Sequence, residues 1–314
     1  MEKLINYFEH IPSLHRSLIL AGGIAFFWLL ESAVPLVSFR YNKWRHAGVN
    51  FFFTFTSIVV NFCLAFILLR TSDYVSTHHF GLLQWGREVL GVGYWASNSL
   101  HLIPNTQYLI VECIVGLLLL DLVGAWSVHY VEHRVKWMWR FHIIHHSDQF
   151  IDTTSANRHH PGESVFRFIF TTAAVVICGA PMWLVFMYQT MSVVLTQFNH
   201  ANITLPKVVD DVLSWVIVSP DMHKVHHHYV LPYTDSNYGN IFSVWDRLFG
   251  TFMKLDREKI VYGIDTFPDS KENAHIPQLL KIPFMKYRSP VGAKFQEYNN
   301  NQTLDEDNSI RKFI

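Results

Sequence analysis

The stretch HYVEHRVKWMWRFHIIHH, residues 129–146, holds five histidines in eighteen residues. His129 and His133 are four residues apart, so on a helix both imidazoles leave the same face. An HxxHH pattern follows, formed by His142, His145 and His146, and its spacing again places three rings along one stripe. Core packing does not require such a density of histidines. The stretch therefore predicts a metal site on helices, around which the rest of the chain is organised.

The HxxHH pattern occurs a second time, as His223, His226 and His227. Neutral imidazole is the most common protein ligand for zinc, copper, nickel and iron. Two triplets and a pair offer more nitrogen ligands than one ion accepts. The sequence therefore predicts a site for two metal ions.

The composition indicates a membrane protein. Half of the 314 residues are hydrophobic and 16% are charged, whereas soluble proteins have about 25% charged residues. The formal net charge is zero, which gives no reason to expect a nucleic-acid partner. The cysteines lie in separate apolar runs, so they fit buried small side chains better than disulfides or a thiolate metal site.

Three apolar segments are long enough to cross a bilayer as helices: Ser17–Val37, Phe51–Leu69 and Tyr108–Trp126. The first lacks the basic start of a signal peptide, so we expect it to be retained. The basic loop 40–45 is expected in the cytoplasm, which puts the N-terminus outside and residues 127–146 just beyond the cytoplasmic face. Glu112 and Asp121 lie inside the third span, where ionisable groups are functional candidates.

A fourth apolar stretch, Val165–Phe198, is interrupted by Gly179, Ala180 and Pro181. Because proline breaks a helix, we expect a hairpin that dips into the membrane and returns His200 to the side of the other histidines. Shorter surface helices are expected at 82–92 and 208–218, and the tail 299–307 is expected to be disordered.

The expected fold is an all-α integral membrane protein with three transmembrane helices plus a helical hairpin, and a cytoplasmic helical cap that holds a di-metal histidine cage. It divides into residues 1–126, with the spans and loops, residues 127–263, with the histidine boxes and the hairpin 165–198, and a C-terminal extension, residues 264–314. We expect this protein in the plasma or inner membrane of a bacterium or in the endoplasmic reticulum of a eukaryote.

Taken together, these motifs resemble those of the fatty acid hydroxylase and sterol desaturase superfamily of membrane di-iron oxygenases. Only eight residues separate HxxxH from the first HxxHH, whereas the stearoyl-type desaturases have a much longer segment there. The resemblance covers roughly residues 121–263. Further matching motifs are His160-Pro161 with Glu163, His200 before Asn202, Asn237-Tyr238-Gly239, and the run WDRLFGT at 245–251.

The resemblance implies that ten histidines surround the metals: His129, His133, His142, His145, His146, His160, His200, His223, His226 and His227. It also implies two iron ions, O2 as co-substrate, and hydroxylation or desaturation of a membrane lipid such as a sterol, fatty acyl lipid, carotenoid or ether lipid. The HPGE at 160–163 is similar to the HPGG of cytochrome b5, but that soluble domain has no room here. We therefore expect a separate electron donor of the cytochrome b5, ferredoxin or reductase type.

Metal-bound imidazoles usually donate their other N–H to a carboxylate, carbonyl or water. The acidic candidates for this role are Asp121, Glu132, Asp148, Asp235 and Asp246. The remaining histidines, which are His159, His228, His275 and those before residue 102, are expected to face solvent.

Two other functional classes stay open at this point. A histidine-rich protein for metal transport or storage would place its ligands within the spans near the midplane, whereas these boxes are expected outside them. A zinc-dependent membrane hydrolase would need about three protein ligands and a general base for each metal, which leaves most of these histidines without a role.

Overall fold

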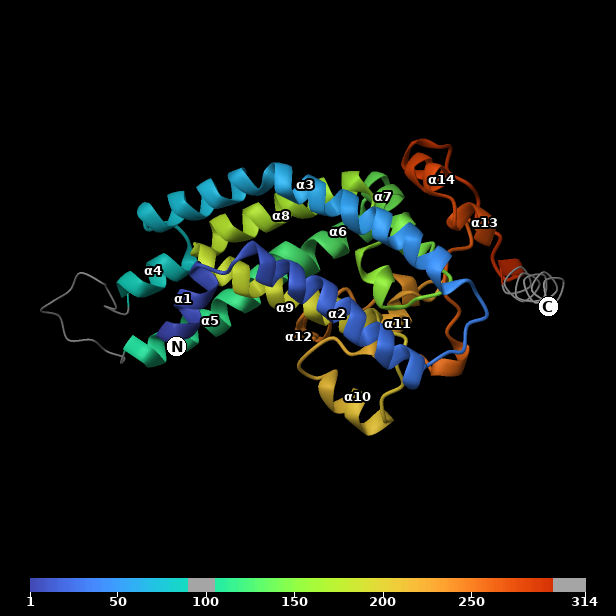
Figure 1. Cartoon of the computed structure of the whole chain (residues 1–314), viewed down its shortest axis with the longest axis horizontal. Coiled ribbons are helices and arrows are strands. Elements are labelled where there is room, and N and C mark those ends of the chain that lie inside the picture. Colours follow the sequence, from blue (N-terminus) through green and yellow to red (C-terminus); the bar gives the residue numbers. More distant parts are fainter. Residues whose placement is uncertain (90–104, 296–314) are drawn as a thin grey trace, which may run out of the picture.

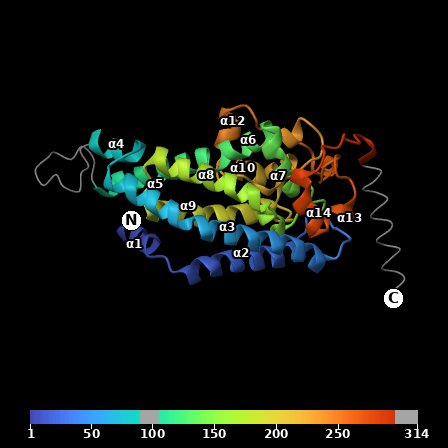
Figure 2. The same cartoon turned by 90° about the horizontal axis from the view of Figure 1, so that it is seen from above.

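The computed structural model describes residues 1–89 and 105–295, and in these ranges it consists of helices, loops and isolated β-bridges. The molecule is elongated, and its long helices run side by side along the long axis (Figures 1 and 2). The prediction of an all-helical protein is confirmed. The helices are α1 Glu2–Glu9, α2 Ser13–Ala33, α3 Lys43–Thr77, α4 Leu82–Val89, α5 Asn105–Asp121, α6 Val128–Arg134, α7 Lys136–His146, α8 Pro161–Cys178, α9 Met182–His200, α10 Lys207–Leu213, α11 Pro220–His226, α12 Val244–Leu248, α13 Ser270–Asn273 and α14 Ile276–Lys281.

Four helical segments among the described residues are long and apolar enough to cross a membrane: Ser13–Ala33, Lys43–Val89, Gln107–Arg134 and Pro161–Cys178. The first three contain most of each predicted span, and the fourth is the first arm of the predicted hairpin. Large apolar side chains cover their outer surfaces, such as Leu29 at 73% exposure and Phe62 at 80%. This surface is suited to lipid and not to water.

Helix α3 is longer than the predicted span 51–69. Its 35 residues correspond to about 52 Å, well beyond the ~30 Å hydrocarbon core of a bilayer. The first two turns therefore reach past the apolar layer to the histidine-bearing end. There Val49 and Phe53 pack with Ile143 of α7 and Leu279 of α14. The polar residues of these turns hide this extension in the sequence, because they suggest a loop.

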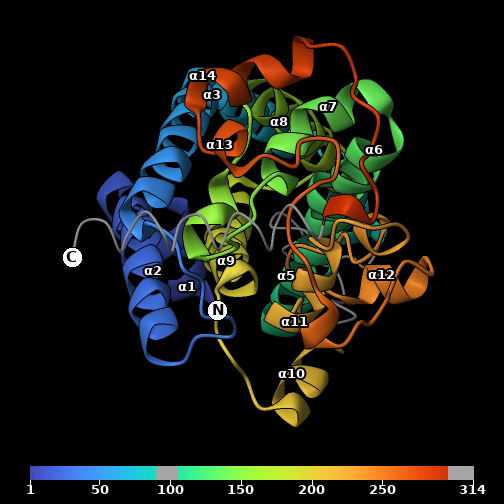
Figure 3. The ribbon, with the colours of Figure 1, turned by 90° about the vertical axis from the view of Figure 1, so that its right-hand side faces the viewer.

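The predicted hairpin is present as α8 and α9 (Figure 1). Gly179 takes a left-handed φ of 70°, and a Cβ there would lie 2.4 Å from the carbonyl oxygen of Phe80, so glycine is required. The turn is held at the far end of the bundle by Ser72, whose hydroxyl donates to the carbonyl of Ala180 (2.9 Å). Helix α9 then runs back through the middle of the bundle, as Figure 3 shows, and ends at His200.

The other predicted elements are partly matched. Helix α4 covers the first part of the expected surface helix 82–92, and α10 covers the first half of 208–218. Residues 90–104 and the tail 299–307 lie outside the described residues. Helix α14, which none of these expectations covers, packs on α3 and α7 through Leu279.

The fold predicts which surface positions share a membrane face. Exposed Ser38 follows α2 at the histidine-bearing end, and exposed Lys259 lies in the same region, whereas exposed Thr77 ends α3 at the far end. In a Cys63→Ser background, we expect cysteines at positions 38 and 259 to react with a membrane-impermeant maleimide from one face of sealed vesicles, and a cysteine at position 77 from the other. If positions 38 and 77 react from the same face, α3 does not cross the membrane.

Candidate metal centre

Nine buried histidine side chains gather in two adjacent groups at one end of the bundle. Ring nitrogens within each group lie within 4.8 Å of one another. The first group is His129, His133, His142, His146 and His226, and the second is His145, His200, His223 and His227. The groups touch, because the rings of His146 and His227 are stacked with centroids 4.8 Å apart. The structure thus brings together nine of the ten histidines singled out in the sequence.

Each HxxHH box is shared between the two groups. In α7, His142 and His146 are one helical turn apart and both enter the first group, whereas His145 points into the second. At α11 the division is reversed: His223 and His227 enter the second group and His226 the first. The sequence suggested one stripe for each box. The structure divides that stripe because residues i and i+4 project together while i+3 is turned away from i+4 by about 100°.

The outward nitrogens of four of the five rings in the first group are held by hydrogen-bond acceptors. Nδ1 of His129 lies 2.8 Å from the carbonyl oxygen of Tyr238, and Nδ1 of His226 lies 2.7 Å from that of Ser236. A carbonyl only accepts, so each Nδ1 carries the proton. Carboxylates accept in the same way from His142 and His133, where Glu163 lies at 2.7 Å and Asp235 at 3.1 Å. Four Nε2 lone pairs of the first group therefore face inward.

This arrangement fits a metal ion. Nε2 of His129 and Nε2 of His142 are 3.1 Å apart, and with both Nδ1 atoms protonated neither can donate to the other. Two lone pairs at this distance repel unless a cation lies between them. Two nitrogens bound to one ion at ~2.1 Å would be about 3.0–3.4 Å apart. Inward nitrogens of His133, His146 and His226 also have no hydrogen-bond partner among the described residues.

The second group shows the same spacing. Nε2 of His200 lies 3.2 Å from Nε2 of His145 and 3.0 Å from Nε2 of His223, and Nε2 of His223 lies 3.1 Å from Nε2 of His227. The Nδ1 of His200 is directed to the carbonyl of Thr196 (2.9 Å). Lys224, buried on the other side of α11, donates to the carbonyl of Ala201 (2.6 Å) and so ties α11 to the end of α9.

Burial keeps these imidazoles uncharged. It lowers the pKa of the rings well below the ordinary histidine value, and neighbouring imidazoles lower it further, in His142, His145, His146, His223, His226 and His227. The neutral ring is the form that binds a metal ion. At neutral pH these six side chains therefore need no deprotonation before they bind.

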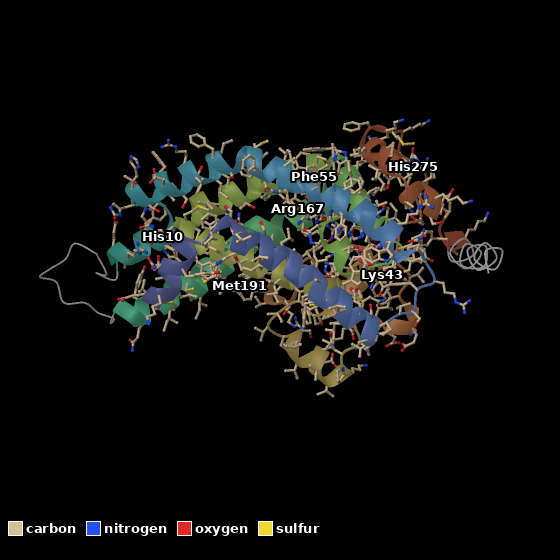
Figure 4. All side chains as sticks on the ribbon, viewed as in Figure 1. His10, Lys43, Phe55, Arg167, Met191 and His275 are labelled. Atoms are coloured by element: carbon tan, nitrogen blue, oxygen red, sulfur yellow. The ribbon has the colours of Figure 1, made fainter. Side chains whose placement is uncertain are left out.

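A buried charge cluster orients His142. Glu163, at the start of α8, accepts from Nδ1 of both His142 (2.7 Å) and His159 (2.8 Å). Arg167, labelled in Figure 4, donates to Glu163 (3.0 Å) and to Glu132 of α6 (2.6 Å). The predicted candidate Glu132 therefore acts mainly through Arg167, since its own oxygen lies 3.7 Å from His142. Sequence reasoning noted Glu163 only as a matching motif residue and missed its contact with His142.

Asp246 fixes the loop that supplies the carbonyl acceptors. This fully buried carboxylate accepts from the backbone N–H of Tyr238 (2.8 Å) and Gly239 (2.9 Å). It also accepts from the indole N–H of Trp126 (3.0 Å) and the hydroxyl of Thr251 (2.8 Å). Asp246 thus joins the π-helical segment Leu122–Ser127, which precedes α6, to the loop beside His129. It reaches the histidines through backbone and does not contact them.

The remaining acidic candidates hold structure further out. Asp121 accepts from the backbone N–H of Ile241 (3.2 Å) and Phe242 (3.1 Å), on the same loop. Asp148 contacts none of the nine histidines and instead bonds Nε2 of His46 in α3 (2.8 Å). Burial opposes ionisation of Asp148, but the charges of His46 and Arg158 outweigh it and lower its pKa.

Several other histidines differ from expectation. His160 lies outside both groups, because its Nδ1 accepts from the backbone N–H of Gly162 (3.0 Å) and caps α8. His46 and His228 were expected to face solvent, but their side chains are buried. His46 bonds Asp148, and Nδ1 of His228 accepts from the backbone N–H of Val261 (2.9 Å). His159 is only partly exposed, since its ring stacks on that of His145, whereas His275 is exposed as expected.

Comparison with known proteins places this geometry in context. Residues 113–251 match the family model described as fatty acid hydroxylase. An ornithine lipid hydroxylase of Rhizobium tropici is 25% identical over 48% of this chain and 45% of its own length. A human alkylglycerol monooxygenase is 31% identical over 48% of this chain and 34% of its own length. The chain thus spans less than half of either relative.

A cholesterol 25-hydroxylase-like protein of Danio rerio is 25% identical over a longer region, 72% of this chain and 83% of its own length. No solved structure matches the chain significantly. The region matched by the family model contains all nine grouped histidines together with Glu163 and Asp246.

The role of Asp246 predicts that Asp246→Asn destabilises the protein. An amide has one acceptor oxygen for four donors, and each hydrogen bond to a charged group contributes about 1.5–3 kcal/mol. We expect the free energy of unfolding to fall by at least ~2 kcal/mol, seen as a lower melting temperature of the detergent-solubilised protein. The control is Asp256→Asn, since Asp256 is exposed and pairs with Lys259 (2.8 Å). Equal melting temperatures for both variants would show that the loop does not depend on Asp246.

Proposed function

This chain belongs to the fatty acid hydroxylase family, and from that premise we propose that it is a di-iron oxygenase that uses O2 to hydroxylate a C–H bond of a membrane lipid. The observation that carries the proposal is the pair of adjacent histidine groups. Their inward ring nitrogens are separated by the distance expected for two ligands of one metal ion. The family match and the apolar outer surface of the bundle point to a lipid as the substrate.

The protein's part in this chemistry is to hold and orient. Two iron ions bound by the nine histidines would supply the power to take hydrogen from an unactivated C–H bond, which no side chain provides. The imidazoles are neutral, so the ligand set adds no negative charge at the ions. Glu163 and Asp235 each lie one hydrogen bond away from one of these rings. They fix ring orientation and make the ligand nitrogen more basic.

The substrate class follows from the relatives and the membrane fold. The relatives are named for an ornithine lipid, alkylglycerols and cholesterol. All are lipids, so we propose a membrane lipid without choosing the headgroup. Hydroxylation, desaturation and ether cleavage begin with the same hydrogen abstraction, and hydroxylation is the reaction that the family name favours.

We further propose that the centre lies on the cytoplasmic side and takes electrons from a separate protein. The basic loop with Arg40, Lys43 and Arg45 lies at the histidine-bearing end, which favours the cytoplasm for that end. This side also gives access to a cytochrome b5-type, ferredoxin-type or reductase donor. The location of the boxes at the end of the bundle favours this reading over metal transport, whose ligands lie near the midplane.

We expect two metal ions per chain in purified protein, iron when it is active. Zinc can replace iron on overexpression, since it stands above Fe2+ in intrinsic affinity. His145→Ala removes a nitrogen of the second group. Loss of a residue that only hydrogen-bonds to a ligand lowers metal affinity by roughly 10-fold to 100-fold, so loss of the ligand itself should lower it at least as much. Elemental analysis counts the ions and competition with a chelator measures the affinity, and exposed His275→Ala is the control. One ion or none in folded wild-type protein would contradict the two-metal centre.

We expect cells that express this protein to contain a lipid that has gained one oxygen atom derived from O2. Mass spectrometry of lipid extracts from cells grown under heavy-isotope oxygen gas measures this gain. His226→Ala should abolish the new lipid, whereas His275→Ala should preserve it, because only His226 lies in the histidine groups. A new lipid whose added oxygen comes from water would point to a hydrolase or hydratase and overturn the oxygenase.

A further inference from the structure

Helix α10 and the turn after it expose apolar side chains far from the long helices. Val208, Val212 and Val216 follow one another at four-residue intervals and are 75%, 64% and 63% exposed, and Trp215 beside them is 69% exposed. We call these four residues the α10 patch. Val208 and Val212 share one face of α10 because they are four residues apart, and Trp215 and Val216 lie in the turn that follows its end at Leu213.

Two polar residues of this segment are buried instead. Asp210 and Ser214, also four residues apart, are 4% and 3% exposed. Asp210 accepts from the hydroxyl of Ser219 (2.7 Å) and the backbone N–H of Asp221 (3.2 Å), at the start of α11. A surface helix in water turns its apolar face to the core and its polar face to solvent. Helix α10 instead turns Asp210 and Ser214 inward and its valines outward, next to the exposed charges of Lys207 and Asp211. Apolar and charged side chains on one outer face suit the interface of a membrane.

The position of α10 identifies that environment. Ile203 pairs with Pro35, directly after α2 ends, and the N–H of Thr204 donates to the carbonyl of Val34 (2.9 Å). Helix α10 begins three residues after Thr204, so the chain starts it where α2 leaves the apolar layer. Figures 1 and 2 place α10 at the level of α2 along the long axis, and Figure 3 shows it projecting beyond the bundle. A bilayer that surrounds α2 extends to this level.

We propose that the α10 patch inserts into the membrane interface and anchors the histidine-bearing end to the bilayer surface. Tryptophan is enriched at that depth, where its ring is apolar and its N–H stays hydrated. Arg247 of α12 lies over the Trp215 ring at 4.6 Å, which suits a cation at the level of lipid headgroups. The level of α10 along the long axis, at the end of the candidate span α2, favours lipid over a protein partner as the occupant of the patch.

The proposed anchor is connected to the histidine groups through α11, the helix that carries the second HxxHH box. Asp210 of α10 bonds Ser219 and Asp221 at the start of α11, four and two residues before His223. The depth of α10 in the interface therefore sets the height of the third histidine box above the lipid. The membrane contact itself is independent of metal and of activity.

A spin label measures the contact directly. The full-length protein, in a Cys63→Ser background, carries Val212→Cys with a nitroxide and is placed in nanodiscs of phosphatidylcholine and phosphatidylglycerol. Collisions with O2, which concentrates in lipid, should exceed collisions with a water-soluble nickel chelate. Lipid-facing Leu29→Cys should behave in the same way, and Lys259→Cys on the exposed surface should show the reverse order.

Two outcomes would overturn the proposal. Preferred collision with the nickel chelate at position 212 would place the patch in water. Protection from both reagents would mean that protein covers it, and dipolar broadening between labels would identify that protein as a second copy of the chain. The result does not depend on catalysis, so the lipid contact and the oxygenase can fail separately.

Discussion

The structure depends on one electrostatic constraint, which is that nine imidazoles turn lone pairs toward the same small volume. A lone pair can point inward only if the opposite ring nitrogen carries the proton. In four rings of the first group that proton is donated to an acceptor, which is a carboxylate in two cases and a backbone carbonyl in the other two. Asp246, Asp121 and Arg167 then hold the segments that carry the acceptors. The buried polar network of the protein is thus arranged around the tautomers of its histidines.

Much of this could be predicted from the sequence. Four-residue spacing puts histidines on one helical face whatever the surroundings, and Gly179 with Pro181 forces a turn between α8 and α9. The acceptors for His129 and His226 could not be predicted, because a backbone carbonyl has no sequence signature. His160 and His159 show a similar limit. They are adjacent, and only tertiary packing decides that the first caps a helix while the second stacks on His145.

Burial also explains the misjudged lengths and surfaces. The first turns of α3 have polar residues that suggest a loop, yet Asn50 donates to Thr154 (2.9 Å) and His46 bonds Asp148, so these polar groups are satisfied inside the protein. Helix α10 is the converse case, because its valines face outward although the sequence pattern would place them in the core. A pattern of polar and apolar residues gives two faces of a helix, and the neighbours decide which one is turned outward.

The sharing of the HxxHH boxes has a consequence for assembly. Because α7 and α11 each contribute to both groups, neither pocket is complete until the two helices have docked, and a displacement of α11 disturbs both pockets at once. The first ion to arrive would order the helices for the second and spare it part of the conformational entropy cost. Loading would then be cooperative, with half-filled protein a minor species, and the centre would form and dissolve as a single unit.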